Sequence, residues 1–319
     1  MPKLNLLDVA KFDGNDRVVG LIEENLTFAP EISIFPARTI KGTSYYTVKR
    51  TGFPTVGFRA ANAGVVPSKS AFARQLTECF ILGGAIECDR AVLEANEDGP
   101  GALEMIEASG VMKAALIQLG KQIWYGVTND ALGFPGVKAI TPKVAVAGSS
   151  TIVVDATGTT SNTASSLYAV AFGNQNCQIV TGQNRAFDLS PFRDQQITDA
   201  NDSTKRLPGR VAELMAWVGL SIQNVNCVGR ILNLTADSGK GLTDSLMADL
   251  FAAFPVGFKP DALFCSRRSR KQIQKSRTVT LFGQGTGRPS QPIIAPIPTE
   301  YDGVPLYATD SILDTDAIE

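Results

Sequence analysis

Histidine is the first residue to look for in a catalytic site, and this chain of 319 residues contains none. Histidine is the usual general base of enzymes and the commonest metal ligand, because its imidazole changes protonation near neutral pH. Its absence excludes Ser-His-Asp and Cys-His catalysis and histidine metal sites. We therefore expect a protein that is not an enzyme and has no catalytic, cofactor-binding or metal-binding residues.

The cysteines offer no alternative chemistry. They are dispersed and odd in number, and no two stand in a C-x-x-C pair, so neither a zinc site nor a disulfide framework is indicated. Buried, reduced thiols in a protein made in the cytoplasm are the preferred interpretation. The positions are Cys79, Cys88, Cys177, Cys227 and Cys265.

Residues 283–287, with the sequence Gly-Gln-Gly-Thr-Gly, resemble half of a dinucleotide-binding loop. Such a loop must lead directly into a helix, whose first N–H groups bind the phosphates. Several prolines follow instead, so no helix can begin, and we expect a flexible loop. A P-loop sequence is also absent, so no nucleotide cofactor is expected.

Two charged segments remain. Residues 267–277 carry six basic side chains and no acidic one, which fits either contact with phosphate or a solvated helix face paired with acidic neighbours. The second interpretation is favoured, because no aromatic residues are interleaved and the whole chain is not basic. The acidic residues near the end lack EF-hand spacing and are expected to lie in a solvated tail. They are Asp310, Asp314, Asp316 and Glu319.

The composition is that of a globular protein with more than one subdomain. The chain is 44% apolar and 19% charged, with a formal net charge of −1. A dedicated nucleic-acid-binding protein normally has a basic excess, so this near balance argues against one. It also leaves little charge repulsion to oppose self-association. We expect no membrane span and no signal peptide, because charged residues interrupt the apolar runs.

A long helix is the element around which the chain is organised. Residues 103–125 contain no proline, and apolar residues recur at steps of three, four and seven on two faces. Pro100 suits the first turn of a helix, and Gly126 suits a left-handed cap after its last turn. The predicted helix is roughly 35 Å long at 1.5 Å per residue. Its two apolar faces indicate that other elements cover it on more than one side.

Two long strands joined by an irregular segment are predicted before this helix. Residues 39–50 are rich in β-forming side chains, residues 51–67 are broken by glycine and proline, and the chain returns as a strand over 75–90. Isolated two-stranded ribbons are marginal in water, so we expect this hairpin to lie on another subunit. Residues 1–35, with a short helix near 17–25, are expected to pack on the body or on a neighbouring chain.

After the long helix, short strands alternate with long loops. Strands are predicted at residues 144–147, 151–155, 169–172, 178–180 and 261–265, and extended chain at 216–234. Loops are predicted at residues 156–166 and 183–207. Helices are predicted at residues 242–254 and 267–277, with Thr243 and Ser266 as N-caps. A last strand at 303–310 is expected to return to the sheet of the first subdomain.

The order of these segments resembles that of tailed-bacteriophage major capsid proteins with the HK97-like fold. The resemblance lies in the succession of an N-terminal arm, a long hairpin, a long helix, residues 129–136 and residues 302–310. Further segments are similar to a branch found in short-tailed phages, namely residues 53–64, 86–90 and 218–234. In this order and spacing, the similarity covers nearly the whole chain.

The resemblance implies an α+β fold with four parts. They are an N-terminal arm at residues 1–37, an extended β-hairpin loop at 38–75, a peripheral domain at 76–139 and 296–319, and an axial domain with a central β-sheet at 140–295. The long helix, at about residues 100–126, would be the spine helix of the peripheral domain. The lysine–asparagine cross-link of some relatives is not carried over to any pair of residues here.

The resemblance also implies a structural function, which is self-assembly into hexamers and pentamers of an icosahedral phage head that encloses double-stranded DNA. The implied partners are copies of the chain, a portal protein and DNA packaged without sequence specificity, and a decoration or cement protein stays open. No long cleavable scaffolding segment precedes the arm, so a separate scaffolding protein is expected. The protein would be made in the bacterial cytoplasm and reside in the virion.

Two alternatives stay open at this point. An encapsulin-like compartment shell shares the fold that the resemblance implies. A histidine-free enzyme with a β-rich domain is a more distant alternative, which a monomeric state in solution would favour.

The hairpin carries the candidate contacts between subunits. The residues expected on inter-subunit surfaces are Tyr45, Tyr46, Lys49, Arg50 and Arg59. Their cations would meet acidic residues of neighbouring copies. The candidate acidic partners are Glu94, Glu97, Asp98, Glu104 and Glu107. A solvated hairpin is the alternative for each residue taken singly.

Overall fold

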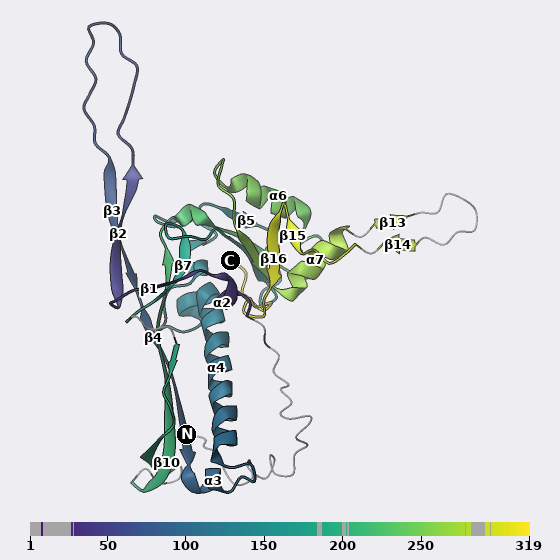
Figure 1. Cartoon of the computed structure of the whole chain (residues 1–319). Helices are drawn as coiled ribbons and strands as arrows, with labels where there is room; N and C mark the ends of the chain where they lie inside the picture. Colours follow the sequence, from purple (N-terminus) through teal and green to yellow (C-terminus); the bar gives the residue numbers. More distant parts are fainter. Residues whose placement is uncertain are drawn as a thin grey trace.

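The computed structural model describes residues 8, 27, 29–183, 187–199, 202, 204–277, 279–281, 291–293 and 295–319. Two six-stranded sheets and a long helix, α4 (Pro100–Tyr125), dominate this part (Figure 1). Most of the predicted arm, including its short helix, and the glycine-rich loop at 283–287 lie outside the described residues.

One long strand, β10 (Arg206–Ile222), organises the first sheet. The strands that pair with it, all antiparallel, are β4 (Phe80–Asp89), β7 (Cys177–Thr181), β8 (Phe187–Leu189) and β9 (Arg193–Thr198). A further short strand, β1 (Ala37–Thr39), pairs with β7 in parallel. Residues 209–218 of β10 face β4, and residues 218–222 face β7. The β4–β10 ribbon therefore runs beside α4 from the lower end of the molecule to its centre (Figure 1).

The second sheet has the strand order β15–β16–β12–β6–β11–β5. Its strands are β5 (Val153–Asp155), β6 (Ser165–Val170), β11 (Val228–Leu234), β12 (Ala262–Cys265), β15 (Glu300–Tyr301) and β16 (Val304–Ala308). Every residue of β6, β11 and β12 is buried, because both faces of the sheet are covered. Leu167 and Ala169 face one cluster with α6 and α7, whereas Tyr168 and Val170 face the end of α4.

The aromatic centre of the body lies where the C-terminal end of α4 meets the second sheet. Trp124 is fully buried and stacks on Tyr168, with ring centroids 4.9 Å apart. Phe264 and Phe35 pack against the same indole at 5.0 and 5.9 Å. Each aromatic pair contributes about 0.5–1.5 kcal/mol beyond the burial of its surface. This cluster therefore joins α4 to strands β6 and β12 of the second sheet and to the segment before β1, which contains Phe35.

The helix predicted at residues 103–125 is confirmed, and its end has a defined cause. Gly126 adopts a φ of 56°, and a Cβ atom there would lie 2.0 Å from the amide nitrogen of Gly136. The turn after α4 doubles back so closely that only glycine fits at this position. The Gln122 side chain secures the turn by donating to the Phe134 carbonyl at 2.8 Å.

The two C-terminal helices also form as predicted. In α6 (Asp244–Ala253), Thr243 Oγ1 accepts from the Leu246 amide, and before α7 (Arg267–Arg277), Ser266 Oγ accepts from the Ser269 amide at 3.2 Å. Both side chains satisfy N–H groups that the first turn leaves unpaired. The remaining short helices are α2 (Glu31–Ile34), α3 (Arg90–Glu94) and α5 (Val137–Ile140), with 3₁₀ turns η1 (Gly126–Thr128) and η2 (Val225–Cys227). A small hairpin of β13 (Val279–Leu281) and β14 (Gln291–Ile293) follows α7.

Three predictions of local structure were wrong. Residues 144–147 form turns and bends rather than a strand. The expected loop at 183–207 contains β8, β9 and the start of β10, because the edge of β10 supplies backbone partners that the sequence pattern does not reveal. The last strand, β16, does not join the first sheet but pairs in parallel with β12 in the second.

Strand pairing crosses the boundary expected near residue 139. Strands β1 and β4 precede this boundary in the chain, and their partners β7 and β10 follow it. In the described part of the chain, no helix has the length and apolar character needed to cross a membrane.

Candidate functional site

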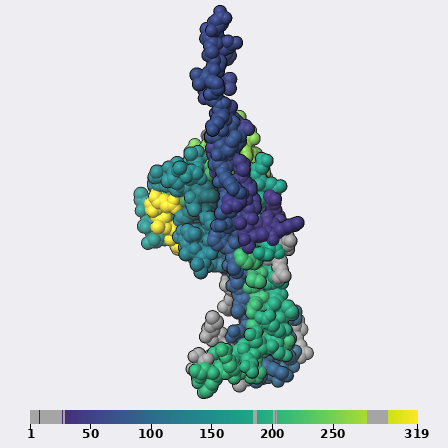
Figure 2. Space-filling view, turned by 90° about the vertical axis from the view of Figure 1, so that its left-hand side faces the viewer, coloured from purple at the N-terminus to yellow at the C-terminus, as the bar shows by residue number. Residues whose placement is uncertain are grey.

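A two-stranded hairpin projects from the body of the molecule. β2 (Ser44–Gly52) pairs antiparallel with β3 (Ala71–Glu78), and residues 53–70 between them form a tip without regular structure. The tip stands clear of both sheets, as Figures 1 and 2 show, whereas the base of the hairpin is hydrogen-bonded to the end of β10. The tip therefore cannot bury its side chains against the body of its own chain.

Apolar side chains are exposed along the whole hairpin. Phe58 at the tip shows 112% of its reference surface to solvent. The large exposed apolar residues here are Tyr46, Val48, Phe53, Val56, Phe58, Val65, Val66, Phe72 and Leu76. Single exposed apolar residues are ordinary, but a set concentrated on one element marks an interaction surface. Full burial of one such side chain by a partner contributes about 1.5–3 kcal/mol.

Local hydrogen bonds give the tip a defined shape. The Ser68 hydroxyl accepts from the Thr55 amide at 2.8 Å and donates to the Thr55 carbonyl at 3.1 Å, so the two sides of the tip are joined. Arg59 Nη1 donates to the Ala63 carbonyl at 2.8 Å across a turn in which Asn62 has a positive φ of 65°. A preformed tip loses less conformational entropy when it docks than a flexible one.

The two candidate tyrosines lie on opposite faces of β2. The Tyr45 hydroxyl is 2.8 Å from Ser221 Oγ at the end of β10, so Tyr45 holds the hairpin base to the body. Tyr46 is 56% exposed, and the Arg74 guanidinium lies over its ring at 3.8 Å from the centroid. Only Tyr46 is thus placed to meet another molecule over most of its surface.

The three candidate cations on the hairpin have no acidic partner among the described residues. Lys49 is half-buried and lines a groove of about 1070 Å³ between β2 and residues 174–176 and 223–226 of the body. Arg50 is exposed and lies over the rings of Phe53 and Phe72, 5.5 Å from each centroid. Arg59 is at the tip. These positive charges are available to acidic groups of a partner.

The candidate acidic residues lie far from the hairpin within one chain. Glu104 is buried near the start of α4, at the end of the molecule opposite the tip, and its carboxylate pairs with Arg210 of β10. Glu107 is half-buried, and burial followed by the nearby Asp8 carboxylate raises the pKa of its carboxyl above the ordinary value. Any contact between these groups and the hairpin cations must therefore join two copies of the chain.

The other acidic candidates flank the same end of α4. Glu94 pairs with Arg90 at 2.7 Å in α3, and Glu97 and Asp98 follow in the turn before α4. Together with Glu104 and Glu107, they gather acidic side chains around the start of α4, where Arg90 and Arg210 pair with two of them.

One charged cluster was missed from the sequence. Arg230 in β11 is only 2% exposed, and its Nη1 and Nη2 atoms donate to the two carboxylate oxygens of Glu319 at 2.9 and 2.8 Å. Arg230 also donates to Ser166 Oγ and lies over the Tyr168 ring. The available signal was a single arginine in the otherwise apolar run of residues 228–234.

This cluster overturns the expectation of a solvated acidic tail. Burial acts to raise the pKa of the Glu319 carboxyl, but hydrogen bonds from Arg230 and Lys138 outweigh it and lower that pKa. Asp316 is half-buried near Lys138, and Asp314 and Asp310 pair with Arg268 and Arg267 of α7. The acidic residues therefore tie the C-terminal segment to the body.

The basic helix α7 follows the favoured interpretation in part. Arg267, Arg268 and Arg277 each pair with an acidic side chain of the body, which accounts for half of its cations. Lys271 and Lys275 are exposed.

No metal-binding group of three or more acidic, cysteine or histidine residues occurs in the ranges that the structure describes. All five cysteines are buried, and burial raises the pKa of Cys227 and Cys265 to about 12, which keeps both thiols protonated and unreactive.

Both the sequence and the fold of this chain are similar to those of known proteins. The chain matches the family model of the major capsid protein GP7 over residues 17–318. No curated protein matches it. Among solved structures, a chain of bacteriophage Epsilon15 is similar with a TM-score of 0.73 and 17% identity, covering 99% of this chain and 97% of that one.

Two further solved structures are similar at lower scores. A chain of the bacteriophage JBD30 capsid has a TM-score of 0.48 and 13% identity, covering 91% of this chain and 93% of that one. A chain of the capsid of a native GTA particle has a TM-score of 0.47 and 10% identity, covering 69% and 95%.

The Epsilon15 similarity establishes the fold, because it extends over nearly the full length of both chains. The family model independently covers almost the whole sequence. The encapsulin alternative is not favoured, since the matched family is one of phage major capsid proteins. The chain belongs to the major capsid protein GP7 family, and it is a phage major capsid protein with the HK97-like fold.

Proposed function

We propose that copies of this chain assemble into hexamers and pentamers of an icosahedral head that encloses double-stranded DNA. The observation that carries the proposal is the projecting hairpin, with apolar side chains and cations that its own body does not cover. A surface of this kind finds its stabilising contacts on other copies of the chain. The alternative of an unpartnered, solvated hairpin leaves the concentration of exposed aromatic and branched residues without a cause.

The physical basis of assembly is the repetition of one unequal contact. The hairpin of one copy and the body surface that receives it are different patches, so the contact is heterologous and closes into rings when the rotation between copies permits. Each copy gives one hairpin and receives another. Modest contacts then reinforce each other, because a subunit held at several places rarely leaves the ring.

The chain would be divided in the shell as the resemblance implies. Residues 1–37 form an arm, 38–75 the extended hairpin loop, 76–139 with 296–319 a peripheral domain around α4, and 140–295 an axial domain. We propose one change to this division. Strand β10 falls within residues 140–295, but its pairing with β4 places its lower part beside α4, and so with the peripheral domain rather than with the second sheet.

Charge complementarity would set the register between neighbouring copies. Lys49, Arg50 and Arg59 lie on the hairpin, whereas the start of α4 carries an acidic set that ends with Glu104 and Glu107. Glu104 pairs with Arg210 within its own chain. Glu94, Glu97, Asp98 and Glu107 are the other proposed partners for the hairpin cations. Tyr46 would pack between copies, and Tyr45 would position the hairpin through Ser221.

The remaining partners follow from the resemblance. We expect a portal protein, a separate scaffolding protein and packaged DNA without sequence specificity, with a decoration or cement protein open. The protein would be assembled in the host bacterial cytoplasm and remain in the virion. No catalytic role is proposed, because the sequence contains no histidine and the thiols of its cysteines are buried.

A charge reversal on the hairpin tests the proposal. In the double variant Lys49→Glu and Arg50→Glu, we expect a large loss of particles in sedimentation and negative-stain microscopy, because like charges would then meet at the interface. The matched control is Lys271→Glu and Lys275→Glu on α7, which makes the same charge change on exposed body residues. Shells in normal yield from the hairpin variant would disprove a role for these cations.

The content of purified particles tests the enclosure of DNA. Nuclease-protected double-stranded DNA in particles from infected cells is expected for a phage head. A shell that holds a cargo enzyme and no DNA would instead support the encapsulin alternative.

A further inference from the structure

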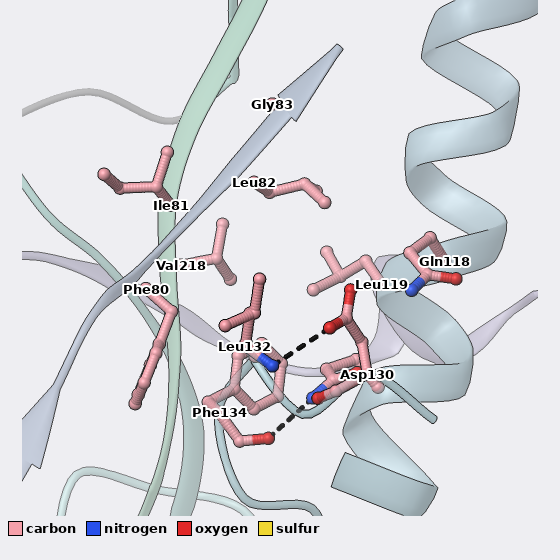
Figure 3. A pocket seen from close by; sticks show the side chains of 12 residues that line it. Phe80, Ile81, Leu82, Gly83, Gln118, Leu119, Asp130, Leu132, Phe134 and Val218 are labelled. Atoms are coloured by element: carbon pink, nitrogen blue, oxygen red, sulfur yellow. Dashed lines mark hydrogen bonds between the residues drawn. The ribbon is translucent and has the colours of Figure 1, made fainter. Parts of the chain in front are cut away.

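An apolar hollow of about 200 Å³ lies where α4, β4, β10 and the turn after α4 meet (Figure 3). Phe80 and Leu82 approach it from β4 and Val218 from β10, while Leu119 comes from α4 and Phe134 from the turn. The hollow is smaller than the roughly 300 Å³ at which small-molecule sites begin. Its size suits a single side chain rather than a cofactor.

The rim of the hollow is exposed and carries one acidic group. Leu132 is 85% exposed, so apolar surface continues from the hollow to solvent. Asp130 stands beside Leu132, and one of its carboxylate oxygens accepts from the Leu132 amide at 3.0 Å. Its other oxygen has no partner among the described residues. A ligand for this site should therefore join an apolar group to a cation.

The hairpin tip offers this combination within two consecutive residues. Phe58 is fully exposed, and among the described residues neither an aromatic ring nor a cation lies over its ring. The adjacent Arg59 has a guanidinium that is held by the Ala63 carbonyl and has no acidic partner in the described part of the chain. Phe53, the other exposed phenylalanine of the tip, is already covered in part by Arg50.

We propose that Phe58 of one copy inserts into the hollow of a second copy, where Arg59 pairs with Asp130. The hollow of the same chain is out of reach, because the tip projects away from the body (Figure 1). The inference rests on the proposed assembly function and deepens it by naming one receiving surface. It assigns Arg59 to Asp130 rather than to the acidic end of α4, which leaves that end to Lys49 and Arg50.

This assignment gives the hairpin two contacts of different kinds. The ring of Phe58 replaces water in an apolar hollow, and burial of such a side chain is the larger part of the contact. The Arg59–Asp130 pair lies at the rim, where it adds direction and partner choice more than affinity. A preformed tip and a preformed hollow can then meet without rearrangement.

A cross-link between introduced cysteines tests the contact directly. Assembled particles of the variant Gly57→Cys/Leu132→Cys, which keeps the Phe58 ring and places the new thiol beside it in open space, are treated with a short bis-maleimide and separated on a denaturing gel. We expect ladders of covalently linked chains, because position 57 of one copy, next to the inserted Phe58, would lie beside position 132 of the next. The background is low, since all five native cysteines are buried. The control pair, Val256→Cys/Leu132→Cys, joins two exposed positions of the body and should give few linked chains.

A charge exchange tests the same contact without cross-linking. Arg59→Asp and Asp130→Arg should each lower the yield of particles roughly tenfold, the effect of about 1.4 kcal/mol, and the double variant should recover most of the loss. Shells that form normally but give neither cross-links nor recovery would overturn this inference and leave the proposed function intact. Absence of shells from the unchanged chain with all its assembly partners would instead overturn the proposed function.

Discussion

The body and the hairpin use the same kinds of side chain to different ends. In the body, Trp124, Tyr168 and Phe264 cover one another and are inaccessible to water. On the hairpin, Phe53 and Phe58 are open to solvent. The stability of the single chain therefore resides in the body, whereas the apolar surface of the hairpin becomes stabilising only when another copy covers it.

Arginine side chains differ between the body and the hairpin in the same way. Arg230 is buried and hydrogen-bonded to Glu319, Ser166 and Thr141, so its charge is fully used within the chain. Arg59 is exposed and, within the part of the chain that the structure describes, bonds only to the Ala63 carbonyl of its own turn. Substitutions in the two regions should therefore separate folding from assembly.

Trp124→Ala should have the largest effect. Removal of the indole leaves a cavity between Tyr168, Phe264 and Phe35, and such substitutions cost about 3–5 kcal/mol. We expect little folded protein, or a much lower midpoint in urea unfolding followed by circular dichroism. Trp217→Ala is the comparison variant, because it removes a tryptophan that lies in the first sheet and outside this aromatic cluster. Equal stability of Trp124→Ala and wild type would show that the aromatic cluster does not hold the body together.

Arg230→Ala should be the next most harmful. It leaves the partly buried Glu319 carboxylate without its main partner, and breaking a buried pair costs roughly 3 kcal/mol. Glu319→Gln keeps one acceptor oxygen for Arg230 and nearly the same volume, and should cost less. The measurement is the unfolding midpoint of both variants. A milder effect of Arg230→Ala than of Glu319→Gln would contradict the role assigned to this pair.

Glu31 predicts a dependence of stability on pH. Its carboxyl is buried beside Ser311, Thr309 and Trp124, and burial raises its pKa above the ordinary value of 4.5. The folded chain therefore keeps this proton to higher pH than the unfolded chain does, so wild type should lose stability as pH rises above 4.5. Glu31→Gln removes this term. Unfolding midpoints of the two proteins should diverge toward neutral pH, with the variant more stable, and converge in acid.

A constant difference between Glu31→Gln and wild type at every pH would count against a titrating Glu31. Asp237 is a useful contrast, because its hydrogen bonds from Thr235 and Thr160 lower its pKa. Asp237→Asn should therefore cost stability at neutral pH and not in strong acid, the opposite sign.

Phe58→Ser should have the smallest effect on the single chain. The side chain is exposed, so the change in unfolding free energy should stay within about 0.5 kcal/mol. Particle yield, measured by sedimentation, should nevertheless fall strongly, because the partner loses a buried ring. Val256→Ser, which changes an equally exposed residue of the body, is the matched control. Normal shells from Phe58→Ser would break the contrast between the two regions.

The parts of the fold that the sequence predicts are those with local causes. The α4 helix follows from its periodicity and from Pro100 and Gly126, and α6 and α7 follow from their caps. Strand β9 was missed because Arg193–Thr198 is polar and largely exposed, without the alternation of a half-buried strand. It becomes a strand because it pairs with β10, and the sequence pattern does not indicate this partner.

The candidate site was predictable in outline and not in its contacts. Glycine, proline and β-forming residues indicate a hairpin with an irregular tip, and a hairpin without a core of its own indicates a partner. The contact of Tyr45 with Ser221 joins residues 176 positions apart, and Arg230 meets Glu319 across 89 positions. Such pairs depend on how the sheets pack, which periodicity along one segment does not encode. Whether neighbouring copies place the hairpin cations against the acidic end of α4 stays a prediction.

The long strand β10 also sets how the subunit responds to load. Residues 209–218 are bonded side by side to β4 along their whole shared length, and the upper end of the same strand is bonded to β7. A pull along the ribbon must shear all these hydrogen bonds at once, whereas a pull across it would open them one after another. The subunit is therefore mechanically anisotropic, stiff along β10 and weaker at right angles to it.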